Sequence, residues 1–195
     1  NENYDRRIQR GRFTKEAKDQ ALEKISFSTD LKEAVKDADY VIEAVPEIMS
    51  LKQNVIREAS ALSPRGTIYA TNTSSLSVSE IAKGAKYPDK VVGTHYFNPP
   101  GTMLLLEIIE GEETSADAVE AADGVARKMG RQIVHVKDVP GFLVNRIWLM
   151  MANEADWAVV QGEAKSLFEV DSAAKYKLGL PMGLFELDDV LQGGS

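Results

Sequence analysis

Two histidines could carry acid–base chemistry in this chain, and their surroundings differ. His95 lies near the end of an apolar run, three residues before a chain breaker at positions 98–100. Open α/β sheets place ligands at the carboxyl ends of strands, and imidazole exchanges protons near neutral pH. This position alone leaves His95 open to a catalytic and to a structural role. His135 stands in an alternating run without acidic or hydroxyl neighbours, so we interpret it as structural.

Glu107 is the candidate partner of His95, because it is the only charged residue in the apolar run 103–109. An unpaired carboxylate is costly to bury. A carboxylate beside a histidine fixes the tautomer of the ring and stabilises the imidazolium. A reverse turn at residues 98–101 would fold strand 104–109 back toward His95. A His95–Glu107 pair is therefore plausible, and the alternative is a Glu107 that faces solvent at a strand edge.

Two further polar groups stand at predicted boundaries. The run 71–75, Thr-Asn-Thr-Ser-Ser, closes a strand, and ordinary loop and capping chemistry explains most such runs. Asn145 follows a Pro-Gly break at the start of a long helix, where a cleft between domains forms. Its alternative explanation is an early helical residue that faces water. Taken singly, each group is explained without a function.

The elements that position these residues alternate between strand and helix up to about residue 140 and are helical beyond it. This order is typical of an α/β sheet domain followed by an all-α unit. The patterns Asp30/Glu33, Ser50/Gln53 and Ser77/Glu80 predict helix starts, and Gly84 is predicted to close its helix in a left-handed conformation. Strands are predicted at 25–29, 39–45, 67–71, 91–97, 104–109 and 132–136, and the longer helices at 50–62, 114–129, 142–160 and from 166 and 183 onward.

Composition narrows the functional classes. The 195 residues carry a net charge of −7, which argues against nucleic acid and anionic membranes as partners. The absence of cysteine excludes a disulfide framework, a thiolate zinc site and a cysteine nucleophile, and we assign no metal site. No apolar stretch approaches the ~18 residues of a membrane span, and no signal-peptide pattern opens the chain. We expect a soluble protein that acts on small molecules, cytoplasmic by default.

The glycines bear directly on nucleotide binding. No two of them lie two positions apart, so the G-x-G-x-x-G loop that brings backbone N–H groups to a pyrophosphate is absent. No Gly-Lys-Ser/Thr sequence occurs either. Either the protein does not bind a nucleotide, or the phosphate-binding unit lies outside these residues.

Several segments together, in order, resemble the NAD-dependent (S)-3-hydroxyacyl-CoA dehydrogenase family: residues 41–47 with Lys52, 70–76, 95–100, 137–146 and 179–187. The resemblance implies a Rossmann-like α/β NAD-binding domain at 1–140, incomplete because the glycine-rich βαβ unit is missing. It implies that 141–195 begin an all-α C-terminal domain for substrate binding and dimerisation. The chain is then expected to be an internal fragment of a longer homodimeric enzyme.

The resemblance also implies roles for individual residues. The reaction would be NAD-dependent oxidation of (S)-3-hydroxyacyl-CoA to 3-oxoacyl-CoA, in fatty-acid β-oxidation or butanoate-type metabolism. His95 would be the catalytic base and Glu107 its electrostatic partner. Residues that hydrogen-bond the hydroxyl or carbonyl and position the acyl chain would be Ser74 and Asn145, and those near the cofactor would be Glu47, Lys52, Ser74 and Asn98.

Two other functions stay open on the sequence. One is a related dehydrogenase that acts on a free hydroxy acid or sugar acid, although the aromatic pair Tyr96-Phe97 favours an acyl-CoA substrate. The other is a non-catalytic fragment that serves as a binding module. The missing glycine loop favours the second alternative, and the intact set of four candidate catalytic residues opposes it.

Overall fold

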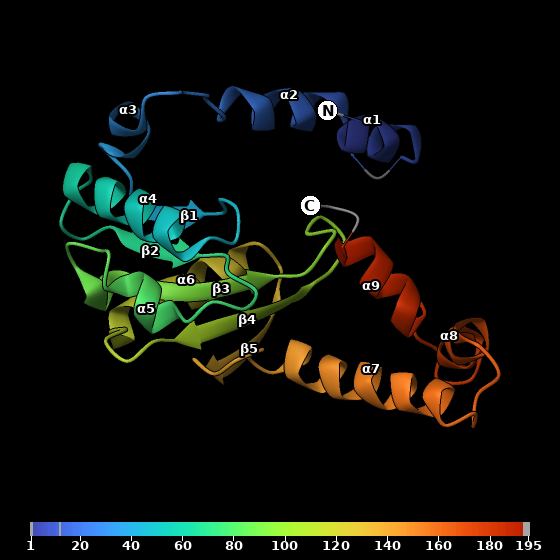
Figure 1. The fold of residues 1–195 in the computed structure, drawn as a ribbon. Coiled ribbons are helices and arrows are strands. Elements are labelled where there is room, and N and C mark those ends of the chain that lie inside the picture. The colour runs from blue at the N-terminus through green and yellow to red at the C-terminus, as the bar shows by residue number, and fades with distance from the viewer. Residues whose placement is uncertain (1, 12, 193–195) are drawn as a thin grey trace.

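The computed structural model describes residues 2–11 and 13–192, which form a five-stranded mixed sheet with helices on both faces and a helical extension (Figure 1). The strands lie in sequence order. β1, β2 and β3 are parallel, β4 is antiparallel to β3, and β5 is parallel to β4. Their bounds are β1 Tyr40–Glu43, β2 Ile68–Thr71, β3 Val91–Tyr96, β4 Leu105–Glu110 and β5 Gln132–Lys137.

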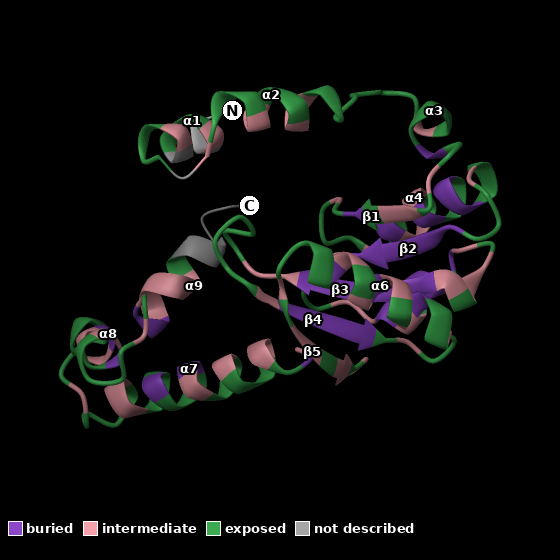
Figure 2. Cartoon of the chain, turned by 180° about the vertical axis from the view of Figure 1, so that it is seen from behind, coloured by how far each residue is buried: buried purple, intermediate pink, exposed green. Residues whose placement is uncertain are grey.

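The helices of the sheet region cover its two faces. Buried residues of α4 and α5 pack with Tyr69, Val91 and Ile109 on one face, and α6 packs alanines against Leu106 and Ile108 on the other. Figure 2 shows the resulting burial of the central strands. The bounds are α3 Leu31–Val35, α4 Met49–Leu62, α5 Val78–Ala82 and α6 Ala116–Lys128, with a 3-10 turn at Pro88–Lys90.

Beyond the sheet the chain is helical. α7 (Val144–Val160) runs away from β5, and α8 (Leu167–Tyr176) and α9 (Leu184–Gln192) fold back on its far part around a small core that includes Ala155, Ala174 and Leu184. At the other end lie α1 (Glu2–Gln9) and α2 (Lys15–Glu23). The ring of Phe13, just before α2, stacks on that of Tyr4 in α1, with 5.2 Å between the ring centroids. The predicted order of an α/β part and then an all-helical part is confirmed.

Much of the local prediction is confirmed, including the side-chain caps at Asp30, Ser77 and Ser166, each of which accepts a backbone N–H of the first helical turn. Gly130 ends α6 with φ +70°. Two details are wrong. α4 begins after Ile48 and not at Ser50. Gly84 is not left-handed, and it is small because a Cβ there would lie 2.7 Å from the carbonyl oxygen of Gln53 on α4.

The predicted strand at 25–29 is also wrong. These residues have no regular structure and are exposed, Phe27 by 95%. A strand forms only when its N–H and C=O groups find a neighbouring strand, and in the described residues the sheet ends at β1 without a strand on its outer edge. Local β-propensity is therefore not enough at this segment.

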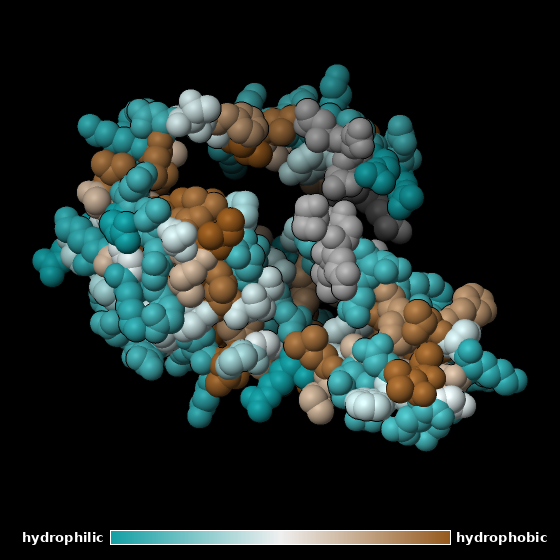
Figure 3. All heavy atoms as spheres, viewed as in Figure 1, coloured by the Kyte–Doolittle hydropathy of each residue, from teal (hydrophilic) through white to brown (hydrophobic). Residues whose placement is uncertain are grey.

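Hydrophobic side chains gather on the surface of the helical extension, as Figure 3 shows over the α7–α9 part. None of the helices in the described part of the chain has the length and apolar character needed to cross a membrane. Among the described residues of the helical extension, the exposed large apolar side chains are those of Ile147, Leu149, Met150, Trp157, Val160, Leu167, Phe168, Tyr176 and Leu178.

Candidate active site

His95 and Glu107 face each other across the antiparallel pair β3–β4. They are register partners, and Nδ1 of His95 lies 2.7 Å from Oε2 of Glu107. Both side chains are buried, with His95 6% exposed. The predicted contact is confirmed, and the turn after β3 produces it as the spacing implied. An ionised carboxylate only accepts hydrogen bonds, so Nδ1 carries the proton. In the neutral ring Nε2 is then the basic nitrogen, and none of the described residues hydrogen-bonds it.

Two aromatic rings fix the position of the imidazole. The ring of Phe97 lies 4.5 Å from that of His95 between centroids, and the ring of Phe142 lies 5.8 Å away. Phe142 is buried and has φ +46°, a left-handed conformation that is rare for residues other than glycine. It follows Gly141, which also has a positive φ of 75°. The chain therefore turns sharply just before α7 and places an aromatic wall beside His95.

Glu107 also holds the start of α7. Its Oε1 accepts the backbone N–H groups of Leu143 and Val144 at 3.0 and 2.9 Å. These are donors that the first turn of a helix cannot satisfy internally. Burial raises the pKa of Glu107, but the hydrogen bonds from His95 and from the two amides outweigh it, so the pKa lies below its ordinary value. The carboxylate is thus charged and fully engaged at neutral pH.

The turn after β2 is clamped from two sides. Oε1 of Glu47 accepts hydrogen bonds from the Thr73 hydroxyl at 2.6 Å, from the amides of Ser74 and Ser75 at 2.9 Å, and from the Ser75 hydroxyl at 3.1 Å. On the other side, Nδ2 of Asn145 donates to the carbonyl oxygen of Ser74 at 3.1 Å. The structure therefore brings together three of the predicted residues, Glu47, Ser74 and Asn145.

The first turn of α7 connects the two groups. Its backbone binds Glu107, and its Asn145 side chain binds Ser74. Strand β3 adds a second link, since the amide of Tyr96 donates to Oδ1 of Asn72 at 3.0 Å. The His95 pair and the Ser74 turn are thus parts of one region at the carboxyl ends of β2 and β3.

Lys52 and Asn98, the remaining predicted residues, differ in their surroundings. Lys52 is fully buried on α4, where its ammonium group meets Glu43 and Glu47. Asn98 is exposed in the turn after β3, and its side chain forms no hydrogen bond with the described residues. His135 has the structural setting expected of it, since its half-exposed ring lies 3.2 Å from Asp123 on the far side of the sheet.

Glu43, Phe142 and Asp138 were not predicted from the sequence as site residues. Glu43 was detectable by the argument used for Glu107, because it is a carboxylate in the β-branched run of strand β1. The carboxylate of Asp138 accepts hydrogen bonds from the hydroxyls of Ser77 and Ser79 and from the amides of Val78 and Ser79 at the start of α5. These contacts join segments about 60 residues apart, so no local sequence pattern reveals them.

Comparison with known proteins decides the family. Residues 1–139 match the sequence model of the 3-hydroxyacyl-CoA dehydrogenase NAD binding domain, and residues 141–194 match that of the 3-hydroxyacyl-CoA dehydrogenase C-terminal domain. The chain belongs to the 3-hydroxyacyl-CoA dehydrogenase family. The family is one of oxidoreductases, and NAD is the cofactor of its first domain.

Similar proteins of this family occur alone and within larger chains. The 3-hydroxybutyryl-CoA dehydrogenase of Clostridioides difficile is 39% identical over 97% of this chain, which spans 66% of that protein. The fatty acid oxidation complex subunit alpha of Shewanella amazonensis is 37% identical over 95% of this chain, which spans 26% of it. The crystal structure of (S)-3-hydroxybutyryl-CoA dehydrogenase from Ralstonia eutropha superposes with a TM-score of 0.91 at 34% identity, covering 97% of this chain and 66% of that one.

Two polar side chains at the strand ends have chemistry that fits part of NAD, the cofactor of the family. The hydroxyl of Ser74 and the carboxamide of Asn98 are exposed, and neither side chain has a hydrogen-bond partner among the described residues. Such groups suit the carboxamide and ribose hydroxyls of the cofactor. The sequence contains no glycine-rich loop for the pyrophosphate.

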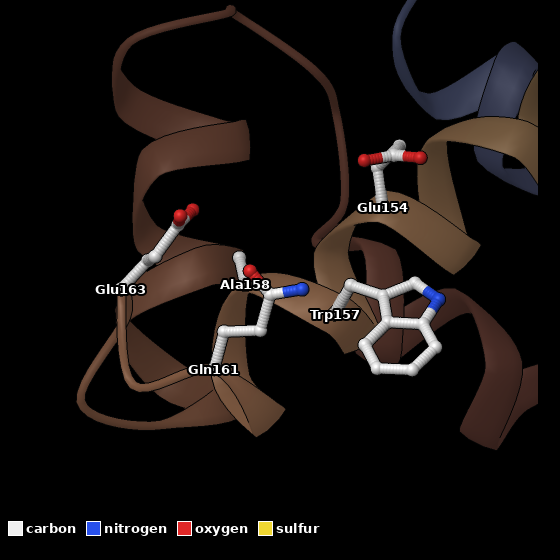
Figure 4. A pocket seen from close by; sticks show the side chains of 5 residues that line it. All are labelled: Glu154, Trp157, Ala158, Gln161 and Glu163. Atoms are coloured by element: carbon white, nitrogen blue, oxygen red, sulfur yellow. The ribbon is translucent and has the colours of Figure 1, made fainter.

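A cavity of about 340 Å³ at the far end of α7 is separate from this region (Figure 4). It is lined by Glu154, Trp157, Ala158, Gln161 and Glu163. None of these residues takes part in the His95 or Ser74 contacts.

Proposed function

We propose that the protein is an NAD-dependent (S)-3-hydroxyacyl-CoA dehydrogenase in which His95 is the catalytic base and Glu107 its electrostatic partner. The observation that supports this most directly is the buried hydrogen bond between Nδ1 of His95 and Glu107. It leaves Nε2 as the basic nitrogen at the carboxyl end of β3, in a chain whose relatives include 3-hydroxybutyryl-CoA dehydrogenases. We further propose the division into an NAD-binding domain, 1–140, and the beginning of a helical domain, 141–195.

In the proposed reaction the chain manages one proton. Nε2 of His95 takes the proton of the 3-hydroxyl group, and Glu107 stabilises the imidazolium that results. NAD supplies the hydride acceptor when it is bound. In the reverse direction the imidazolium donates its proton to the 3-oxo oxygen. Because Phe97 and Phe142 flank the ring and exclude water, the charge on His95 is stabilised mainly by Glu107.

The polar residues around His95 would position the reactants. Ser74 and Asn145 would hydrogen-bond the substrate oxygen and orient the acyl chain, while Glu47, Lys52, Ser74 and Asn98 would form the cofactor side. The turn that carries Ser74 is already held by Glu47 and Asn145, so its hydroxyl is preorganised. An acyl-CoA substrate, a homodimeric assembly and a cytoplasmic location belong to the same proposal.

Replacement of each histidine tests the assignment. We expect His95→Gln to lower kcat by about 100-fold or more, because it removes a general base, and to leave the KM for NADH nearly unchanged. His135→Gln is the matched control and should keep normal turnover, since the half-exposed His135 ring faces Asp123 on the other side of the sheet. The assay is loss of NADH with acetoacetyl-CoA, compared with free acetoacetate. Normal turnover by His95→Gln, or a preference for the free acid, would contradict the proposal.

A further inference from the structure

A buried ion pair between Glu43 and Lys52 lies beside the Ser74 turn. Nζ of Lys52 is 3.0 Å from Oε1 of Glu43, and both side chains are almost completely excluded from solvent, at 0% and 1% exposure. Desolvating two charges is expensive, and their attraction repays it only when the remaining hydrogen-bonding groups are also satisfied. Hydrophobic residues of similar size in place of such a pair are often as stable or more stable, so stability alone does not account for the pair.

The hydrogen-bonding capacity of Lys52 is used within the chain. An ammonium group has three N–H donors. Lys52 donates to both carboxylate oxygens of Glu43 and to the carbonyl oxygen of Val45 at 3.1 Å, and it forms an ion pair with Oε2 of Glu47 at 3.3 Å. Glu43 is equally engaged, since it also accepts the Thr71 hydroxyl and the amide of Val45, both at 2.6 Å. Lys52 is therefore held by Glu43 and Val45, with its charge next to Glu47.

Glu47 carries the connection onward to the turn. One of its oxygens faces Lys52, and the other accepts the four donors of Thr73, Ser74 and Ser75. Burial raises the pKa of Glu47, but these hydrogen bonds and the nearby Lys52 lower it to about 2. The carboxylate is thus a charged anchor for the turn that presents Ser74.

We propose that Glu43 is a positioning residue: it holds Lys52, Lys52 orients Glu47, and Glu47 sets the backbone of residues 73–75. The ordered contacts run from the end of β1, through the first turn of α4, to the loop after β2. This inference rests on the proposed function for its catalytic meaning. It gives Lys52 a second task, the orientation of Glu47, beside its place on the cofactor side.

Removing the charge of Glu43, of Lys52 or of both distinguishes an effect on the position of the Ser74 turn from an effect on the stability of the protein. We expect Glu43→Gln and Lys52→Met each to lower the thermal midpoint by roughly 10 °C. Lys52→Met leaves the buried Glu43 carboxylate without its cation, and Glu43→Gln leaves the buried ammonium group with only the partly exposed Glu47 as counter-charge. The double variant Glu43→Gln/Lys52→Met should recover most of that loss. It should still show a kcat/KM about tenfold below normal, the effect of roughly one lost hydrogen bond to a charged group. Lys83→Met is the control, because Lys83 forms an exposed pair with Glu80 on α5.

The amide NMR signals of Ser74 and Ser75 provide a readout that needs no substrate. They should move in the double variant and stay in place in Lys83→Met. Unmoved signals, or a double variant that regains normal kcat/KM together with its stability, would overturn the inference. If the protein instead acts on another substrate, the signals still report on the contacts, so failure of the proposed function is distinguishable from failure of this inference.

Discussion

Replacing Glu107 with glutamine tests the link between the acid–base pair and α7. The carboxylate accepts three hydrogen bonds, one from Nδ1 of His95 and two from the amides of Leu143 and Val144. A carboxamide has only one acceptor oxygen, and its NH₂ group must face the other side. If the oxygen stays with the two amides, the NH₂ group meets Nδ1 and forces the proton to Nε2. If the oxygen stays with His95, the NH₂ group opposes two backbone donors.

Both arrangements are costly, and they differ in where the cost falls. The first places the proton on the nitrogen that must act as base, and a wrong tautomer lowers kcat by about 10² to 10⁴-fold. The second leaves two partly buried donors without acceptors, at up to about 1–3 kcal/mol each in unfolding free energy. We therefore expect Glu107→Gln to lower kcat, the free energy of unfolding, or both, by amounts that are easily measured.

Two measurements on the same variant distinguish these arrangements. Urea unfolding gives the change in stability, and the ¹⁵N shifts of the His95 ring give its tautomer. Because the chain has only two histidines, the variant His135→Gln leaves a single imidazole to observe. Glu110→Gln is the matched control, an exposed position on the same strand. A Glu107→Gln protein with normal stability, an Nδ1–H tautomer and kcat within a factor of about three of normal would refute the reasoning.

Two further predictions concern stability. Gly93→Ala should destabilise the protein by about 1–3 kcal/mol in urea unfolding, because the new Cβ would lie 2.7 Å from Val78 and 2.8 Å from Ile109. Gly124→Ala on α6 is the matched control: nothing lies within 4 Å of its Cβ, so it should stabilise the protein by about 0.5–1 kcal/mol. Equal changes in unfolding free energy for the two variants would contradict this. The folded pKa of Glu47 is depressed to about 2 from 4.5, so its contribution to stability is present above pH 4.5 and is lost as the pH falls toward 2. Thermal midpoints should therefore drop over this range, less steeply in Glu47→Gln, and parallel curves would argue against the anchor.

The sequence was most informative where a residue type conflicted with its surroundings. Glu107 in an apolar run and the breaker after His95 together predicted a contact across 12 residues, and the register of β3 and β4 produces it. The strands and the helix caps followed from local propensity and periodicity. These signals are local, so they reach only as far as a turn or a neighbouring strand.

The features that were not predicted from the sequence depend on how distant segments of the backbone come together in the fold. The left-handed turn at Phe142 follows from the path between β5 and α7 and has no sequence signature, because phenylalanine rarely adopts that conformation. The failed strand at 25–29 has strand propensity but no pairing partner among the described residues. The reach of Asp138 to the start of α5 joins segments 59–61 residues apart.

Three carboxylates of this chain share one structural task, which explains why the site is organised around them. Glu107 accepts the first amides of α7, Glu47 those of the turn after β2, and Asp138 those at the start of α5. Each satisfies backbone donors that no secondary structure can. Each has a lowered pKa because side-chain donors first, and these amides next, outweigh the effect of burial. Hydrophobic periodicity orients the strands but cannot fix a loop to within a hydrogen bond. In this protein the buried and half-buried carboxylates do that, so their loss should displace the reacting groups before it unfolds the sheet.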